Sequence, residues 1–98
     1  IFMKKPHHVE RFSSFIKDEL ALFLREELAY KEGMLISLMR VEPAPSEGSI
    51  YAWVSVWPDG ERDWVAKRLR LLENKAKAYL AARLNRKYAV AVHFHVIE

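Results

Sequence analysis

The stretch Ser49–Gly60, SIYAWVSVWPDG, carries the clearest structural pattern in the chain. Every second residue in it is aliphatic: Ile50, Ala52, Val54 and Val56. The residues between them are aromatic or small and polar: Tyr51, Trp53, Ser55 and Trp57. Because successive side chains of a strand point to opposite faces of a sheet, this alternation predicts a strand with a buried aliphatic face and an outward aromatic face. The turn residues of WPDG end the strand.

Two more strands and two helical segments are predicted around this strand. Residues 34–45, MLISLMRVEPAP, are apolar and β-branched over a short length, which is typical of a strand, and PAPSEG then breaks it. Residues 89–98, AVAVHFHVIE, alternate again and predict a last strand. Residues 7–33 have apolar side chains at the spacing of a helix that ends at Gly33. Helical spacing returns from residue 61 to about residue 87.

Each helical segment has one apolar stripe. In the first segment the stripe consists of Phe12, Phe15, Ile16, Leu20, Phe23, Leu24 and Leu28. In the second it consists of Val65, Leu69, Leu72, Ala76, Leu80 and Leu84. This second stripe passes through ENKAKAYL, residues 73–80, without a change of phase, so local propensity favours one continuous helix there. The order of elements predicts an α+β domain in which helices pack on one face of a three-stranded sheet.

The bulk composition limits the classes of protein to which the chain can belong. A length of 98 residues, of which 51% are hydrophobic, fits one folded domain over residues 1–98, with 1–7 as a loose N-terminal segment. The absence of cysteine excludes disulfides, thiol catalysis and cysteine metal sites, and it suits a reducing cytoplasm. No apolar run approaches the roughly 20 residues of a membrane helix, and the N-terminus lacks the apolar core of a signal peptide. We therefore expect a cytoplasmic protein with no membrane partner.

No arrangement of residues typical of an active site is visible. There is no close Ser/His/Asp set, and the glycine motifs that bind phosphates or dinucleotides are absent. His93 and His95 share a face of the last predicted strand, but no acidic residue at matching spacing completes a metal site. The sequence therefore predicts a protein that is not an enzyme and that has no metal, cofactor or small-molecule substrate.

The charge of the chain is unevenly distributed. The net charge is +3, yet residues 7–32 hold four basic and six acidic residues, whereas residues 62–88 hold nine basic and two acidic ones. Phosphate contacts from such a basic block supply salt-dependent affinity for RNA without reading its sequence. The RNA-binding residues predicted from the block are Lys67, Arg70, Lys75, Lys77, Arg83, Arg86 and Lys87. Basic residues also solvate exposed helices and complement the dipole at a helix end, so part of the block has a purely structural explanation.

Tyr51, Trp53 and Trp57 form a candidate interaction platform on the outward face of the predicted sheet, on the same side as the two histidines of the last strand. Three interpretations stay open: the stacking of RNA bases, the binding of a protein or a second copy of this chain, and coverage by the N-terminal segment. Base stacking is the least favoured, because the sheet carries almost no Lys or Arg, apart from Arg40, to hold an RNA backbone.

Four segments in series resemble the family of ribosome-binding factor A, a bacterial assembly factor of the small ribosomal subunit. VERFSSFIKDELALFL, residues 9–24, looks like that family's first helix. The residues at its recurrent positions are Arg11, Ile16, Glu19 and Leu20. MRVEPAPSEGSIYAWVSV, residues 39–56, is similar to the two-strand region, and VHFHV, residues 92–96, to the final strand. LLENKAKAYLAARL, residues 71–84, resembles the segment in which the family has an Ala-x-Gly bend.

The resemblance implies a KH-like fold of the second type, with the order α-β-β-α-α-β and without the Gly-x-x-Gly loop of ordinary KH domains. It also implies a ribosome assembly factor that binds small-subunit (16S) rRNA late in subunit maturation. The family's bend maps to Ala76, Lys77 and Ala78, so we expect a kink or offset between Asn74 and Ala78. A monomer is expected. The alternative functions are a protein-interaction or dimerisation module and a general single-stranded RNA binder.

The chain departs from the family's pattern at several positions. Ala78 stands where the family has Gly, and Ala81 and Ala82 replace its customary basic pair after the bend. Val90 stands near the place of the family's Pro before the last strand. The stretch from Ala78 to Phe94 is about four residues shorter than expected, roughly one helical turn. These departures predict an RNA footprint that is reduced or shifted toward the following residues: Arg83, Arg86 and Lys87.

Overall fold

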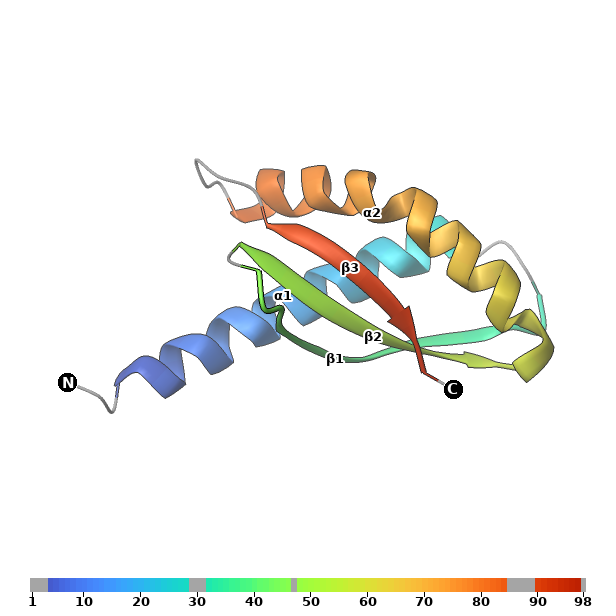
Figure 1. The fold of residues 1–98 in the computed structure, drawn as a ribbon, viewed down its shortest axis with the longest axis horizontal. Coiled ribbons are helices and arrows are strands. Elements are labelled where there is room, and N and C mark those ends of the chain that lie inside the picture. The colour runs from blue at the N-terminus through green and yellow to red at the C-terminus, as the bar shows by residue number, and fades with distance from the viewer. Residues whose placement is uncertain (1–3, 29–31, 47, 85–89, 98) are drawn as a thin grey trace.

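The computed structural model describes residues 4–28, 32–46, 48–84 and 90–97, with side chains from residue 14 onward. In these residues, five regular elements and one short 3-10 helix follow one another along the chain (Figure 1). They are α1 (Lys4–Leu28), β1 (Leu35–Pro43), β2 (Ser49–Trp57), η1 (Asp59–Glu61), α2 (Arg62–Leu84) and β3 (Ala91–Val96). This order confirms the predicted α+β class and the predicted number of strands.

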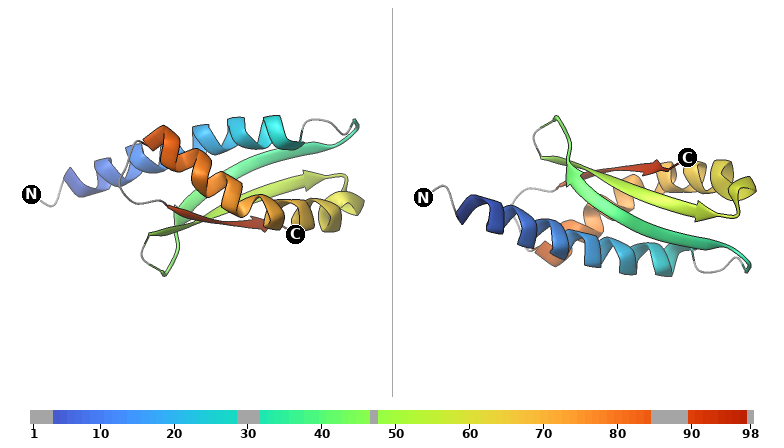
Figure 2. Two further views of the ribbon diagram at one scale, coloured as in Figure 1. Left: turned by 90° about the horizontal axis from the view of Figure 1, so that it is seen from above. Right: turned by 90° about the horizontal axis from the view of Figure 1, so that it is seen from below.

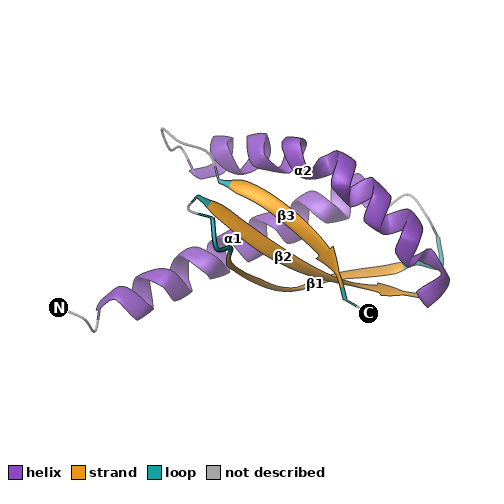
Figure 3. Ribbon diagram, viewed as in Figure 1, coloured by secondary structure: helices purple, strands orange, loops and turns teal. Residues whose placement is uncertain are grey.

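The three strands form one mixed sheet in the order β1-β2-β3. β1 and β2 form an antiparallel hairpin, and β3 lies parallel to β2 on its other side. The chain passes from β2 to β3 through α2, which packs along β3, while α1 packs along β1 (Figure 2). Both helices belong to one layer and the strands to the other (Figure 3). The predicted two-layer arrangement is therefore confirmed.

Burial in the sheet follows the alternation of the sequence. The aliphatic residues of β2 are all buried: Ile50, Ala52, Val54 and Val56. They belong to one core cluster with the buried residues of α2, which are Val65, Leu69, Leu72, Ala76 and Leu80. The core also contains residues of α1 and of the chain around β3: Ile16, Leu20, Phe23, Leu24, Leu28, Val90 and Val92. Because this core fills only the helix-covered face, the aromatic residues of β2 lie on the open face.

α2 is a single helix through the segment in which two helices were expected. Ala76, Lys77 and Ala78 all lie inside Arg62–Leu84. The helix curves along its length in Figure 1, but it is not divided into two elements. α2 contains neither Gly nor Pro, and it is rich in the strong helix formers Ala, Leu, Lys and Arg. One helix therefore takes the place of the expected pair, and local propensity decides the backbone here.

α1 begins earlier than the sequence pattern predicts. The helix begins at Lys4, so residues 4–7 are helical instead of forming a loose segment. Pro6 is tolerated because the first N–H groups of a helix have no intrahelical acceptor. The described part of the helix runs to Leu28, and Gly33 lies in the turn before β1, where it has a φ of 77° that suits glycine.

The apolar stripe of α1 is narrower than the sequence pattern predicts. Phe15 is 41% exposed, whereas Ile16 and Leu20 are fully buried. The sheet and α2 contact the side of α1 on which Ile16 and Leu20 lie, and Phe15 is at the border of that side. Phe12, which was also assigned to the stripe, lies outside the described side chains.

The part of the chain that the structure describes has neither a membrane-spanning helix nor a cluster of metal-binding side chains. No helix there is long and apolar enough to cross a membrane. Within the same residues, no three side chains of the metal-binding types are close enough together to hold an ion. His93 and His95 are both exposed on the open face of the sheet.

Candidate nucleic-acid interface

The side of α2 that faces away from the core carries a row of basic side chains. Lys67, Arg70 and Lys77 are all exposed, and their spacing places them on one side of the helix. They extend over about 15 Å, because a helix rises about 1.5 Å per residue. Among the described residues, no carboxylate forms an ion pair with any of the three. These three residues are called the outer row below.

The first half of the outer row borders a shallow hollow of about 430 Å³. Lys67 and Arg70 line it together with Ala66 and Leu71, and Asp63 contributes one carboxylate to it. Leu71 is 75% exposed, so an apolar surface lies directly beside the two cations. A ligand with both phosphates and flat apolar groups, such as RNA, matches this combination of charge and apolar surface.

Lys75 and Arg83 lie on the side of α2 that faces α1, and acidic residues of α1 neutralise them. Lys75 Nζ is 2.8 Å from Glu27 Oε2, and Arg83 Nε is 3.4 Å from Glu19 Oε1. The two basic side chains nevertheless remain 63% and 56% exposed. The structure thus divides the predicted basic block into the outer row and these two residues, which are called the inner pair below.

Tyr79 connects the inner pair to α1. Its hydroxyl donates a hydrogen bond of 3.0 Å to Glu19 Oε1, and its ring centroid lies 5.3 Å from that of Phe23. The guanidinium carbon of Arg83 lies over the same ring, 5.1 Å from its centroid. Burial raises the pKa of Tyr79, the hydrogen bond to Glu19 raises it further, and Arg83 opposes both effects. The neutral phenol therefore acts as a fixed link between α1 and α2.

The other residues predicted on α2 are placed as follows. Ala76 is fully buried, whereas Lys77 and Ala78 are exposed, so the predicted bend motif presents one charge to solvent. Arg86 and Lys87 lie outside the described residues. The expected shift of the RNA footprint toward the end of the helix therefore stays a prediction, and only Arg83 of that group is described.

The predicted platform on the open face of the sheet is a cluster of paired rings. The ring of Trp53 stacks on that of His95 with 4.9 Å between centroids and an interplanar angle of 27°. Tyr51 meets His95 edge-on at 4.8 Å and lies 6.1 Å from His93. The register of β2 and β3 explains these contacts, because Tyr51 is opposite His93 and Trp53 is opposite His95.

Arg40 and Glu42 of β1 complete the cluster on the other side of Trp53. The guanidinium carbon of Arg40 lies 4.8 Å from the centroid of the Trp53 ring, and Trp53 Nε1 donates a hydrogen bond of 2.8 Å to Glu42 Oε1. Because β1 and β3 flank β2, Arg40 and His95 cover opposite faces of the indole. The Trp53 ring is therefore already in contact with two neighbouring side chains, which leaves less of it for an RNA base to stack on.

Trp57 is the member of the platform that is not part of this cluster. It is 62% exposed at the end of β2, where its cross-strand neighbour is Leu35 of β1. The three aromatic residues that the sequence placed on one platform thus have different surroundings. Tyr51 and Trp53 stabilise the sheet through their neighbours, and Trp57 is available to a partner.

The sequence pattern did not identify the residues that pair with the predicted sites. Glu19 and Glu27 neutralise the inner pair, and Arg40 and Glu42 enclose Trp53. The excess of acidic residues in the first helical segment indicated that this segment could neutralise basic residues elsewhere in the chain. It could not specify the partners, because residues such as Glu19 and Tyr79 are 60 positions apart.

Comparison with known proteins does not assign this chain to a family. No model of a protein family matches the sequence. No curated protein matches it either. The surfaces described above are therefore the basis on which a function can be proposed.

Proposed function

We propose that this protein binds RNA through the outer row of α2 and acts as an assembly factor that contacts small-subunit (16S) rRNA. The observation that carries the proposal is the outer row itself, in which Lys67, Arg70 and Lys77 are exposed along one side of a continuous helix. Such a row can neutralise successive phosphates of an RNA strand and release their counterions. Contacts of this kind position a protein on RNA without reading its sequence.

The distribution of charge between the helices supports the choice of this surface. The acidic residues Glu19 and Glu27 of α1 are engaged by the inner pair, which offsets part of the positive charge between the helices. The outer row forms no ion pair among the described residues, and Asp63 is the one carboxylate in the hollow that it borders, so its charge is offset less than that of the inner pair. A polyanion is therefore attracted to the outer side of α2 more strongly than to the side that faces α1.

The assembly role rests on the resemblance to the ribosome-binding factor A family. The order α-β-β-α-β and the mixed sheet are compatible with the KH-like fold that this resemblance implies. One continuous, curved α2 stands where that family has two helices, so the outer row lies along a single helix. The monomeric, cytoplasmic, non-enzymatic character of such factors is part of the proposal.

The first test measures binding of protein-free 16S rRNA by filter retention over a series of salt concentrations. Arg70→Glu/Lys77→Glu should remove most of the affinity and lower the slope of log affinity against log salt by about 1.5, because each lost phosphate contact contributes roughly 0.7–0.9. Lys17→Glu/Arg25→Glu is the matched control, since it reverses one exposed lysine and one exposed arginine on α1. The control should bind nearly as the unmodified protein does.

The second test measures co-sedimentation with immature and mature small subunits, and immature subunits should retain more protein. Equal weakening of rRNA binding by the two double variants, or affinity that hardly changes with salt, would contradict phosphate contacts by the outer row. Equal affinity for random RNA and for small subunits would favour a general single-stranded RNA binder instead.

A further inference from the structure

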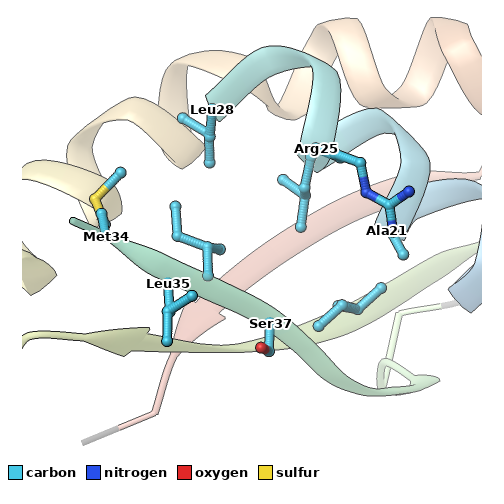
Figure 4. Close-up of a pocket in the computed structure, with 9 residues that line it drawn as sticks. Ala21, Arg25, Leu28, Met34, Leu35 and Ser37 are labelled. Carbon is cyan, nitrogen blue, oxygen red and sulfur yellow. The ribbon is translucent and has the colours of Figure 1, made fainter. Parts of the chain in front are cut away.

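A groove runs between the second half of α1 and the beginning of β1 (Figure 4). Its volume is about 400 Å³, and most of its lining is apolar, including Ala21, Leu24, Leu28 and Ile36. Arg25 also lines it, and this arginine is exposed. The groove lies on the far side of α1 from the inner pair, so no residue of the proposed RNA surface takes part in it.

β1 is an edge strand of the sheet, and its free edge borders this groove. Alternate backbone N–H and C=O groups of an edge strand point outward without a strand partner. At the opposite edge, the N–H of Phe94 donates a hydrogen bond of 2.9 Å to Glu73 Oε2, so α2 partly closes that edge. No similar contact closes Leu35–Leu38 within the described part of the chain. The bulge between Leu38 and Arg40 limits the regular free edge to this short segment.

Exposed apolar side chains lie near the free edge, and two of them, Leu35 and Trp57, project from the open face of the sheet, which is opposite the groove. Leu35 is 66% exposed, Met39 50% and Trp57 62%, and Leu35 and Trp57 are cross-strand neighbours. Large exposed side chains on the open face can contact the outer side of a strand that is added at this edge, as in many protein-binding surfaces. A free strand edge beside such a groove can take up an extended peptide, whose backbone pairs with the edge while alternate side chains enter the groove.

The charge around the groove indicates which kind of segment fits. Arg25 lines the groove, and the exposed Lys17 lies one turn before Ala21, which also lines it. If two copies of this chain paired through β1, two-fold symmetry would bring Lys17 and Arg25 of one copy beside those of the other. Like charges would then repel, whereas a segment with acidic residues would neutralise both cations.

We infer that the groove between α1 and β1 binds an extended segment of a partner protein, with apolar residues at alternate positions and acidic residues at its ends. The segment adds to the sheet as a strand beside Leu35–Leu38, and its carboxylates meet Lys17 and Arg25. This inference goes beyond RNA binding and does not rest on it, because the outer row belongs to α2 and the groove to α1 and β1.

The probe is the synthetic peptide ETVTVTE with both ends blocked, whose pattern reads the same in either strand direction. In an extended strand its glutamates and valines share one face. Fluorescence anisotropy of the labelled peptide should show saturable binding to the unmodified protein, weaker by about tenfold for Lys17→Glu/Arg25→Glu. This double variant should prefer the charge-reversed peptide KTVTVTK. A version of ETVTVTE that is N-methylated along both edges should not bind, because it cannot pair with a strand in either direction.

Hydrogen exchange locates the bound peptide. Saturating ETVTVTE should protect amides within Leu35–Leu38, and Arg70→Glu/Lys77→Glu should bind the peptide as the unmodified protein does. The inference is overturned by absence of saturable binding, by equal binding of ETVTVTE and KTVTVTK, or by protection confined to other strands. Dimers of the free protein that protect Leu35–Leu38 would overturn it as well, since the edge would then serve self-association.

Discussion

Tyr79 joins the two helices by a hydrogen bond that ionisation would break. Its hydroxyl donates to Glu19 Oε1, and burial together with this bond raises the pKa of Tyr79 above its usual value of 10.0. A pKa that is higher in the folded state than in the unfolded state contributes stability that is complete below the unfolded value. This contribution is lost as the pH rises through the folded value, because the tyrosinate and the Glu19 carboxylate repel each other.

Tyr79→Phe should therefore lower stability at neutral pH and lose its effect in alkali. The expected cost is about 1 kcal/mol near neutrality, where the hydrogen bond to Glu19 is intact. Above a pH of about 10, the difference in stability between the two proteins should shrink as Tyr79 ionises. Urea unfolding of both proteins, at neutral pH and at a pH above about 10, measures the difference in their free energies of unfolding. A difference that stays constant across the range would show that the phenol does not stabilise the contact between α1 and α2.

At the scale of the element, the helix propensity of the α2 residues and their packing both favour one continuous helix. The residues ENKAKAYL are good helix formers, and Leu72, Ala76 and Leu80 keep the buried stripe in phase across them. The small side chain of Ala76 is fully buried, which lets the helix approach the sheet and α1 closely. Because α2 is continuous, the three cations of the outer row lie on one side of the same helix. The backbone of α2 therefore sets their positions relative to one another.

Ala78→Gly tests whether Ala78 has helical backbone angles. Because Ala78 is exposed in the interior of α2, the substitution should lower the free energy of unfolding by about 1 kcal/mol. Ala82→Gly is the matched control near the end of the helix, where the cost should be smaller because helix ends fray. Urea unfolding compares the two variants. Unchanged or increased stability for Ala78→Gly would indicate that the backbone leaves the helix at this residue.

At the scale of the whole molecule, the charges of α1 and α2 are arranged so that one side of α2 is neutralised and the other is not. The inner pair contacts Glu19 and Glu27, whereas the outer row faces solvent. Ion pairs as exposed as these contribute less than about 1 kcal/mol each to stability. Their larger effect is on the field that a polyanion meets, because they reduce the positive charge on the side that faces α1.

Glu19→Gln/Glu27→Gln should therefore strengthen RNA binding while changing stability little. The substitutions remove two negative charges and release the inner pair, and the glutamine at position 19 still accepts the hydrogen bond of Tyr79. Affinity for 16S rRNA at low salt should rise, and the salt dependence should become steeper. Filter retention measures both quantities. If affinity and salt dependence stay as they are in the unmodified protein, Lys75 and Arg83 lie outside the RNA-binding surface.

The sequence by itself determined the elements and the faces that they bury. The period of two in β2 placed Ile50 and Val54 inside and Tyr51 and Trp53 outside, and the period of α2 separated the core stripe from the outer row. These features depend on neighbouring residues, whose side-chain directions follow from backbone geometry alone. The same local reasoning favoured a continuous α2, and the expectation of two helices came from the resemblance instead.

Only the tertiary structure decided which charges are paired and which edges are open. Glu19 and Tyr79 are 60 positions apart, and no local pattern specifies that they meet. The enclosure of Trp53 by Arg40 and His95 depends on the order of the three strands, as does the exposure of β1 beside α1. These contacts arise from packing between distant segments, where side-chain volume and register set the distances. For this reason the outer row was visible in the sequence, whereas the inner pair's partners and the groove were not.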